Sequence, residues 1–151
     1  MATTARTAVP AVDGWFTVSD RPKLIGGRCP ACGTYVFPPR SGACPNPDCS
    51  SDELVATELS SHGPIWSYTE NRYAPPPPFE ATDPFEPYAI AAVELVDEGL
   101  VVLGQVAKGV LAADLCIGME MQLELDVLRR DDEHDYLVWV WAPAAPERGG
   151  A

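Results

Sequence analysis

Four of the five cysteines stand in two close pairs with the spacing C-x2-C-x11-C-x4-C, and this pattern constrains the fold more than any other feature. A tetrahedral zinc site needs four soft ligands at about 2.3 Å, and each pair presents two sulfur atoms from one turn. Two disulfides or an iron centre are the alternatives, because the second pair has a wider gap than usual. We expect one structural zinc ion, since four protein ligands leave no position for a reactive water. The predicted ligands are Cys29, Cys32, Cys44 and Cys49.

The cysteine count also bears on the cellular compartment. An odd number of cysteines in a chain of 151 residues favours reduced thiols over a secreted disulfide framework. Residues 1–14 lack the basic start and apolar core of a signal peptide, and no apolar run reaches the roughly 20 residues of a membrane helix. We therefore expect a cytoplasmic protein with no membrane-spanning segment. The fifth cysteine, Cys116, has no basic or histidine neighbour in sequence, which predicts a buried, inert thiol.

The chain beyond the cysteine pairs has the pattern of β-strands. Residues 119–127 alternate between apolar and polar side chains, the period of a strand with one wet face. Two apolar runs, 88–95 and 100–107, flank Gly99, whose positive φ can close a hairpin. Six prolines between residues 74 and 87 predict a long loop. Further strands are expected at 54–59, 65–73 and 136–141, and about five strands after the ribbon suit a small Greek-key barrel of the OB type.

These patterns divide the chain into four segments and predict a mainly β protein. Residues 1–22 form an N-terminal tail, mobile as far as residue 13, with a short helical segment and contacts to a partner. Residues 23–53 form a zinc ribbon, and residues 54–143 form a five-stranded OB-fold barrel. Residues 144–151 form a disordered tail.

The charge of the chain argues against nucleic-acid binding. Twenty-two acidic residues stand against ten basic residues, which gives a formal net charge of -12. Binding to nucleic-acid phosphates draws its affinity from lysine and arginine side chains that displace counterions. The only loose cluster of basic residues precedes residue 41, and its members are Arg6, Arg21, Lys23, Arg28 and Arg40.

The aromatic residues exceed what small sheets need for their core. The chain has thirteen of them, and Trp139 and Trp141 share one face of the last predicted strand. Tyr136, Val138 and Val140 share its other face, so both faces of this strand are apolar. We expect part of this apolar surface to be covered by a partner protein.

Several short motifs occur in order between residues 14 and 141. They are Gly14-Trp-Phe16, Cys29-Pro-Ala-Cys-Gly33, Phe37-Pro-Pro-Arg40, Cys44 with Cys49, Trp66-Ser-Tyr-Thr69, Pro87-Tyr-Ala-Ile90, Val93-Glu-Leu95 and Ile117-Gly-Met119. In these motifs the chain resembles a family of zinc-ribbon plus OB-fold proteins, long catalogued as a domain of unknown function. Members of that family accompany thiolase-superfamily enzymes that act on acyl-CoA. The departures are the wider second cysteine pair and His62, where the family often has a small residue.

The resemblance implies an N-terminal segment, a rubredoxin-like zinc ribbon and an OB barrel. It also implies that the chain is a non-catalytic subunit of a thiolase, synthase or aldolase complex. The segment from Asp131 to Trp139 is similar to versions from steroid-degrading actinobacteria, in which the domain also occurs fused to a hydratase subunit. There it pairs with a thiolase-fold retro-aldolase of the lipid-transfer-protein type, which splits a shortened sterol side-chain acyl-CoA. The resemblance therefore implies a hetero-oligomer, two copies of each subunit, with acyl-CoA at the shared boundary.

Specific residues are candidates for these contacts. The predicted partner-binding residues are Trp15, Phe16, Phe37, Pro38 and Phe79, the last of them in the proline loop. Arg28 and Arg40 are candidates to bind the phosphates of CoA, because a guanidinium binds phosphate through a bidentate fork. A solvated pair that balances nearby charge is the alternative for these two arginines.

Two other functions are alternatives to the accessory subunit. Zinc ribbons and OB barrels often bind single-stranded nucleic acid through aromatic stacking and basic grooves, which the charge of -12 opposes. A hydrolase that uses Cys116 or His62 lacks a base and an orienting partner at recognisable spacing, so we predict no catalytic residues in this chain.

Overall fold

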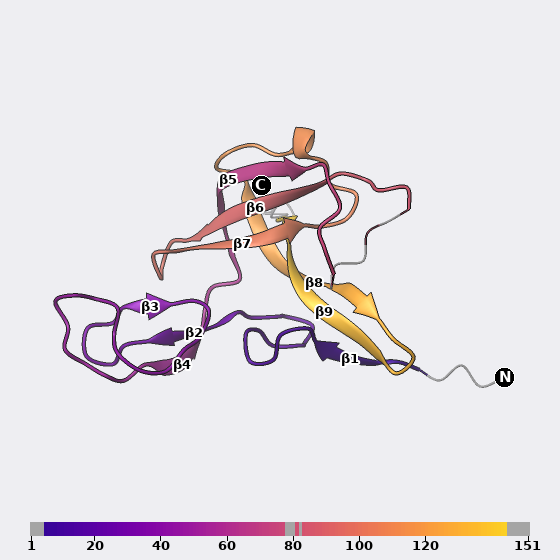
Figure 1. Ribbon diagram of the computed structural model, residues 1–151. Coiled ribbons are helices and arrows are strands. Elements are labelled where there is room, and N and C mark those ends of the chain that lie inside the picture. The colour runs from indigo at the N-terminus through magenta and orange to yellow at the C-terminus, as the bar shows by residue number, and fades with distance from the viewer. Residues whose placement is uncertain (1–4, 78–80, 82, 145–151) are drawn as a thin grey trace, which may run out of the picture.

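The computed structural model describes residues 5–77, 81 and 83–144, and nearly all of their regular structure is β-strand (Figure 1). The strands are β1 (Thr7–Pro10), β2 (Ile25–Arg28), β3 (Tyr35–Val36), β4 (Val55–Glu58), β5 (His62–Asn71), β6 (Tyr88–Leu95), β7 (Leu100–Val106), β8 (Glu120–Arg130) and β9 (His134–Pro143). One 3-10 helix, η1 (Ala112–Asp114), is the only helical element in the described residues. No helix among them has the length and apolar character needed to cross a membrane. The predicted fold class is confirmed.

The last five strands close into a barrel. Their order is β9-β7-β6-β5-β8, and β8 pairs again with β9 to complete the circle. Side chains alternate across β6, so that Ala89, Ala91, Val93 and Leu95 all point into the core and are at most 2% exposed. Full burial of a large apolar side chain stabilises a fold by roughly 1.5–3 kcal/mol. The five-stranded OB-fold that the sequence predicts is therefore present.

Local turn chemistry explains where the barrel strands begin and end. Gly99 has a φ of 69° and closes the predicted hairpin between β6 and β7. The side chain of Asp131 accepts hydrogen bonds from the backbone N–H groups of Glu133 and His134 at 2.8 and 2.7 Å. Because of this turn, β9 begins at His134, whereas the sequence predicts that the strand begins at residue 136. A register shift between Val127 and Arg129 lets β8 continue to Arg130.

The zinc ribbon has its own sheet, in the order β3-β2-β4. The sequence predicts that the strand at 54–59 belongs to the barrel, but as β4 it pairs antiparallel with β2 and belongs to the ribbon. The reason is the glycine pair in β2, which brings three strands close together. A Cβ at Gly26 would lie 2.5 Å from the carbonyl oxygen of Val36, and one at Gly27 would lie 2.9 Å from the Val36 side chain.

The N-terminal segment is a correction to the prediction of a mobile tail with a short helix. Residues 7–10 form β1, which pairs parallel with β9 from Thr7 opposite His134 to Pro10 opposite Leu137. Arg6 Nε also donates a hydrogen bond of 2.9 Å to the carbonyl oxygen of Asp131. β7 pairs with β9 only at Val140 and Trp141, so the first half of β9 has a free edge that β1 occupies. A non-local edge of this kind leaves no signal in residues 1–13 themselves.

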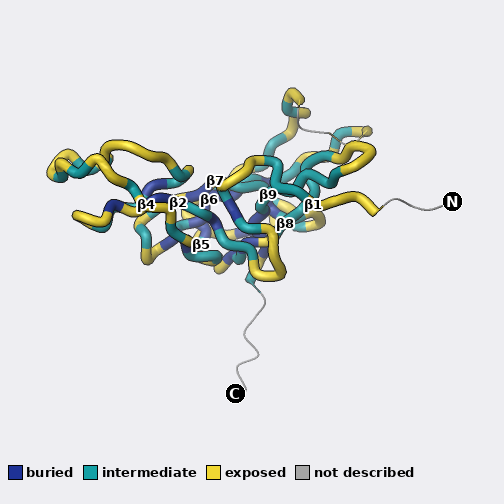
Figure 2. The backbone as a smooth tube through the Cα atoms, turned by 90° about the horizontal axis from the view of Figure 1, so that it is seen from below, coloured by how far each residue is buried: buried dark blue, intermediate teal, exposed yellow. Residues whose placement is uncertain are grey.

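Four aromatic side chains join the N-terminal segment, the ribbon and the barrel, and we call them the junction cluster: Trp15, Phe16, Phe37 and Trp139. The ring centroid of Trp139 lies 6.2 Å from Trp15, 5.7 Å from Phe16 and 5.8 Å from Phe37. Trp139 Nε1 donates to the carbonyl oxygen of Leu103 at 3.1 Å. Figure 2 shows the buried stretches concentrated in the middle of the molecule, with the ribbon loops exposed at one end.

Candidate metal centre

The first cysteine pair lies in a tight turn that follows β2. Cys29 donates its backbone N–H to the carbonyl oxygen of Thr34 at 2.8 Å, and its own carbonyl oxygen accepts from Gly33 at 2.8 Å. Gly33 has a φ of 81°, a conformation that side-chain-bearing residues rarely adopt, so glycine is required at this point in the turn. The turn therefore places Cys29 and Cys32 on the same side of the loop.

The second pair lies in a separate loop with its own backbone hydrogen bonds. The N–H of Cys44 donates to Ser51 at 2.9 Å, and the N–H of Cys49 donates to Asn46 at 3.0 Å. Asn46 Oδ1 also accepts a hydrogen bond of 3.0 Å from the N–H of Asp48. These contacts fold the four-residue gap into a turn, so its unusual width does not separate the two sulfur atoms.

The four sulfur atoms converge on one point. All four Sγ atoms lie within 4.8 Å of one another. The distance is 3.8 Å between Cys29 and Cys49, and 3.5 Å between Cys32 and Cys44. Four sulfurs at 2.3 Å from a central zinc form a tetrahedron with edges of about 3.8 Å. All the cysteines are free, which excludes the two disulfides.

The electrostatics of the four thiols call for a cation. Hydrogen bonds from the hydroxyl and N–H of Thr34 lower the pKa of Cys32 to about 6. At Cys44, the N–H of Asn46 acts in the same direction, but burial and the neighbouring thiols outweigh it and raise the pKa to about 11. Four adjacent thiolates repel one another, so they ionise together only when a metal ion supplies positive charge.

The cluster is therefore the site of one structural zinc ion. Four protein sulfurs close the coordination shell and leave no position for a water or a substrate. Binding energy at such a site is folding energy for a small sheet that has little core of its own. Cys116 does not belong to the cluster, and it is exposed, which corrects the prediction of a buried thiol. It lies in the loop between η1 and β8, where Leu115 is buried in the core and Met119 packs against it.

The two candidate CoA-binding arginines both belong to the ribbon. Arg28 ends β2, and the backbone of Arg40 passes beside this strand, with its carbonyl oxygen 3.7 Å from the position that a Cβ on Gly27 would take. Both arginines are exposed, and in the part of the chain that the structure describes neither has an ion-pair partner. The guanidinium of Arg28 lies 5.7 Å from the ring centroid of Tyr35, so one face of it rests against an aromatic side chain.

The predicted partner-binding residues have different surroundings. Trp15 and Phe37 are half-buried in the junction cluster, and Pro38 is exposed beside Phe37. Phe16 is only 5% exposed and bridges to Leu24, so it is a core residue of this chain and the prediction of a partner contact there is corrected. Phe79 lies outside the described residues.

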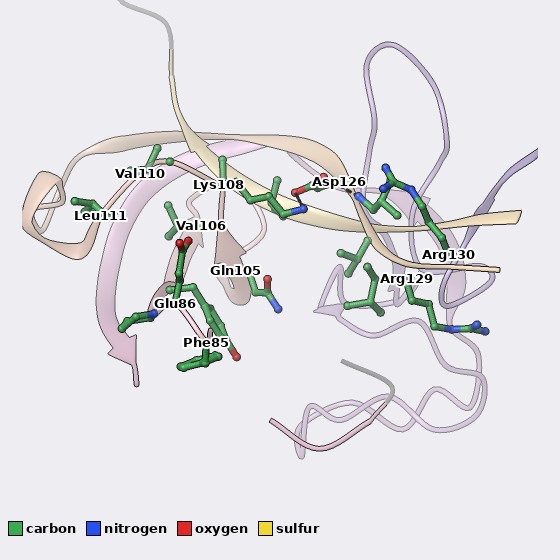
Figure 3. Close-up of a pocket in the computed structure, with 18 residues that line it drawn as sticks. Phe85, Glu86, Gln105, Val106, Lys108, Val110, Leu111, Asp126, Arg129 and Arg130 are labelled. Carbon is green, nitrogen blue, oxygen red and sulfur yellow. Dashed lines mark hydrogen bonds and ion pairs between the residues drawn. The ribbon is translucent and has the colours of Figure 1, made fainter. Parts of the chain in front are cut away.

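A cavity of about 410 Å³ opens beside the barrel between β7, β8, β9 and the end of the proline loop (Figure 3). Figure 3 shows the side chains of Lys108 and Asp126 pointing toward one another, and Arg129 extending away from Gln105. Each basic side chain that lines the cavity has a partner in the chain. Lys108 Nζ lies 3.5 Å from Asp126, Arg129 lies 3.6 Å from the ring centroid of Tyr136, and Arg130 Nε lies 3.2 Å from Asp135. The cavity thus offers no free cluster of cations to a phosphate.

A second surface was not identified from the sequence. The outer faces of β5, β6 and β7 carry apolar side chains that we call the outer patch: Trp66, Ile90, Ala92, Val101 and Leu103. Leu103 is 63% exposed and Trp66 is 62% exposed. The sequence carried a signal, because a period of two places Val101 and Leu103 on one face, opposite the buried Val102. Apolar runs do not by themselves distinguish the inner from the outer face of a strand.

Two family models match adjacent parts of the chain. The ChsH2 rubredoxin-like zinc ribbon domain matches residues 20–55, and the ChsH2 C-terminal OB-fold domain matches residues 56–126. A DUF35 domain-containing scaffold protein of Methanocaldococcus jannaschii is 32% identical over 129 residues, which cover 85% of each chain.

Two further relatives carry names that refer to enzymes. A probable enoyl-CoA hydratase alpha subunit of Thermomonospora curvata is 33% identical over 133 residues. This match covers 88% of the present chain but only 37% of that subunit. A solved structure described as the Ltp2-ChsH2(DUF35) aldolase contains a chain with 28% identity and a TM-score of 0.62. The match covers 82% of the present chain and 86% of the solved one.

Proposed function

The chain belongs to the family of ChsH2-type, or DUF35, proteins that join a rubredoxin-like zinc ribbon to an OB-fold, and on this premise we propose that it is a non-catalytic subunit of an acyl-CoA enzyme complex. The observation that carries the proposal is the likeness to a chain of a solved aldolase, which extends over both the ribbon and the barrel. A zinc site closed by four cysteines supports a structural contribution of this kind.

The proposal places the chemistry on the partner subunit. Cleavage of a carbon–carbon bond needs a positioned base and a group that stabilises the developing negative charge. In the described part of the chain, His62 Nδ1 pairs with Glu120 at 2.9 Å, and His134 Nδ1 lies 3.5 Å from Asp131. Neither histidine lines the cavity beside the barrel, and the zinc site has no open position, so we assign the reacting groups to the partner.

At the finer level, we propose that the partner is a thiolase-fold retro-aldolase of the Ltp2 type and that the substrate is a steroid or sterol side-chain acyl-CoA. The name of the solved structure supports an Ltp2-type aldolase as the partner, and the name of the enoyl-CoA hydratase subunit from Thermomonospora curvata supports an acyl-CoA substrate. The proposed assembly is a cytoplasmic hetero-oligomer with two copies of each subunit.

We propose that Arg28 and Arg40 bind CoA phosphates at the boundary with the partner. Their support is that both lie in the ribbon and that neither has an ion-pair partner among the described residues, whereas Lys108 and Arg130 at the cavity beside the barrel are paired with carboxylates. A charge-assisted hydrogen bond to phosphate contributes about 1.5–3 kcal/mol. Loss of either arginine should therefore weaken acyl-CoA binding by the complex and leave its assembly intact.

The test combines this chain with the thiolase-fold aldolase subunit of the same organism. We expect a complex by analytical ultracentrifugation, and acyl-CoA cleavage only when both subunits are present. Arg40→Ala should raise the KM for acyl-CoA about tenfold or more. Arg72→Ala, which removes an arginine paired with Glu70 on the barrel, is the matched control and should leave KM unchanged. Acyl-CoA cleavage by the isolated chain, or the absence of any complex, would contradict the proposed function.

A further inference from the structure

The outer patch extends across three paired strands, with polar side chains among its apolar ones. Leu103 of β7 pairs with Ala92 of β6, and Ala92 pairs with Ser67 of β5. Ala92 is only 6% exposed, so the exposed apolar surface is that of Trp66, Val101 and Leu103. Large apolar side chains that gather in water on one face of a sheet mark a candidate interaction site.

A β-bulge brings a tryptophan to the border of the patch. Ile65 pairs with Val93 and Ser67 pairs with Ala92, so Trp66 is the extra residue between them. Bulges turn a side chain out of the regular alternation, and here 62% of the tryptophan side chain is exposed. No ring contact, hydrogen bond or core contact is recorded for Trp66 within the described residues. Exposed tryptophan beside an apolar centre is the composition of an interface hot spot.

The patch is held rigidly. The carbonyl oxygen of Leu103 accepts a hydrogen bond from Trp139 Nε1, which fixes β7 to the junction cluster. At the other end, Glu98 Oε1 accepts hydrogen bonds of 2.9 Å from the N–H and the hydroxyl of Ser60. These contacts tie the tip of the β6–β7 hairpin to the segment that leads from the ribbon into the barrel. A preorganised surface loses little conformational entropy when a partner binds.

The charges around the patch indicate the chemistry of the partner. Glu94 lies on the same outer face and pairs with Val101, and Asp97 is an exposed residue of the turn between β6 and β7. No hydrogen bond or ion pair engages either carboxylate among residues 5–77, 81 and 83–144. Two unpaired carboxylates at one end of an apolar patch are complementary to an apolar surface with basic side chains at its border. A second copy of this chain would bring like charges together.

We infer that the outer patch is the docking surface for the thiolase-fold subunit of the proposed aldolase complex, given that the chain has that function. The partner surface has an apolar centre that accommodates Leu103 and Trp66. Lysine or arginine side chains around that centre meet Glu94 and Asp97. The ribbon, with its free arginines, remains available at the acyl-CoA boundary.

The experiment measures association of the host's Ltp2-type aldolase subunit with wild type, Leu103→Lys and Leu103→Glu. Both substitutions remove an apolar contact, and we expect Kd to rise about 30-fold or more. Lysine should impair binding more than glutamate, because only lysine repels basic side chains at that border. Glu94→Gln should slow association and reduce its dependence on salt. All variants should keep the zinc content and melting temperature of the wild type, since Leu103 is an exposed side chain.

Leu111→Lys is the matched control, because Leu111 is 62% exposed on the rim of the cavity and not on the outer patch. It should bind the aldolase subunit as tightly as the wild type. If Leu103→Lys also binds like the wild type, or if both lysine variants fail equally, the assignment of the patch is wrong while the proposed function stands. A wild-type homodimer that Leu103→Lys dissociates would likewise overturn it. Failure of wild type to bind any thiolase-fold subunit would instead contradict the proposed function.

Discussion

Individual residues define the zinc site, and this is the part of the molecule that sequence spacing predicted best. The four cysteines needed no long-range information, because each pair is placed by a turn within a few residues. The spacing could not predict the environment of Cys116, because exposure depends on how η1 and the loop before β8 pack on the barrel. The sequence therefore predicts the zinc ligands correctly but not the exposure of the fifth cysteine.

Replacing Cys29 with serine should remove zinc and unfold the ribbon. Cys29 is fully buried and its sulfur belongs to the tetrahedral cluster, so serine leaves three ligands and a weaker metal site. We expect metal analysis to fall from one zinc per chain to a small fraction, with a lower melting temperature. Cys116→Ser is the control and should retain the zinc and the melting temperature of the wild type. An unaltered melting temperature after complete removal of the metal would refute a structural role.

Asp131 should titrate well below an ordinary carboxyl group. The hydroxyl of Tyr136, at 2.8 Å, and the N–H groups of Glu133 and His134 lower its pKa from 3.8 to about 2. Because the folded pKa is the lower one, the carboxylate stabilises the turn above pH 4 and loses this effect as the pH falls towards 2. Carbon-13 NMR of the Asp131 carboxyl group measures the midpoint. Tyr136→Phe should move the midpoint up towards 3.8, and an unchanged midpoint would show that the hydroxyl is not the main cause.

At the scale of elements, strands with local signals were predictable and their distant partners were not. The alternation at 119–127 and the glycine of the β6–β7 turn gave β8 and the hairpin directly. β1 and β4 differ because their places depend on edges formed by β9 and β2, far away in the sequence. The alternation in β9 correctly put Trp139 and Trp141 on one face, but it did not show that Trp139 packs against the ribbon and the N-terminal segment.

Truncation of Trp139 should loosen the link between ribbon and barrel. Trp139 contacts three other aromatic rings and donates a hydrogen bond to Leu103, and all of these contacts are lost in Trp139→Ala. We expect a loss of about 2–3 kcal/mol in the free energy of unfolding, below the value for a fully buried tryptophan. Zinc should remain bound, because Trp139 belongs to the barrel whereas the four cysteine ligands belong to the ribbon. Urea denaturation with zinc analysis measures both.

Trp66→Ala is the matched control for this substitution. The side chain of Trp66 is 62% exposed, so its removal should change the free energy of unfolding by no more than about 0.5 kcal/mol. Equal losses in the two variants would mean that the junction cluster has no special part in joining the two modules.

Across the whole molecule, acidic and basic residues are distributed unevenly between the part that contains the ribbon and the part that contains the barrel. The first 49 residues carry five basic and three acidic side chains, and the remaining residues carry five basic and nineteen acidic ones. The barrel is therefore the strongly acidic module. OB barrels that bind single-stranded nucleic acid pair aromatic side chains with a basic groove, whereas the cations of this barrel are paired with its own carboxylates or stacked on a tyrosine.

Single-stranded oligonucleotides should consequently bind this protein with a Kd weaker than about 0.1 mM at physiological salt. Fluorescence anisotropy of a labelled oligonucleotide measures this directly, with a basic OB-fold protein as the positive control. Asp132→Lys combined with Glu133→Lys adds two cations to the turn between β8 and β9, beside Arg130. If charge is the reason for the absence of binding, this variant should gain a salt-sensitive affinity that the wild type lacks. Micromolar binding by the wild type that weakens as salt rises would instead revive nucleic-acid binding as the function, because the acidic surface would then have failed to exclude a polyanion.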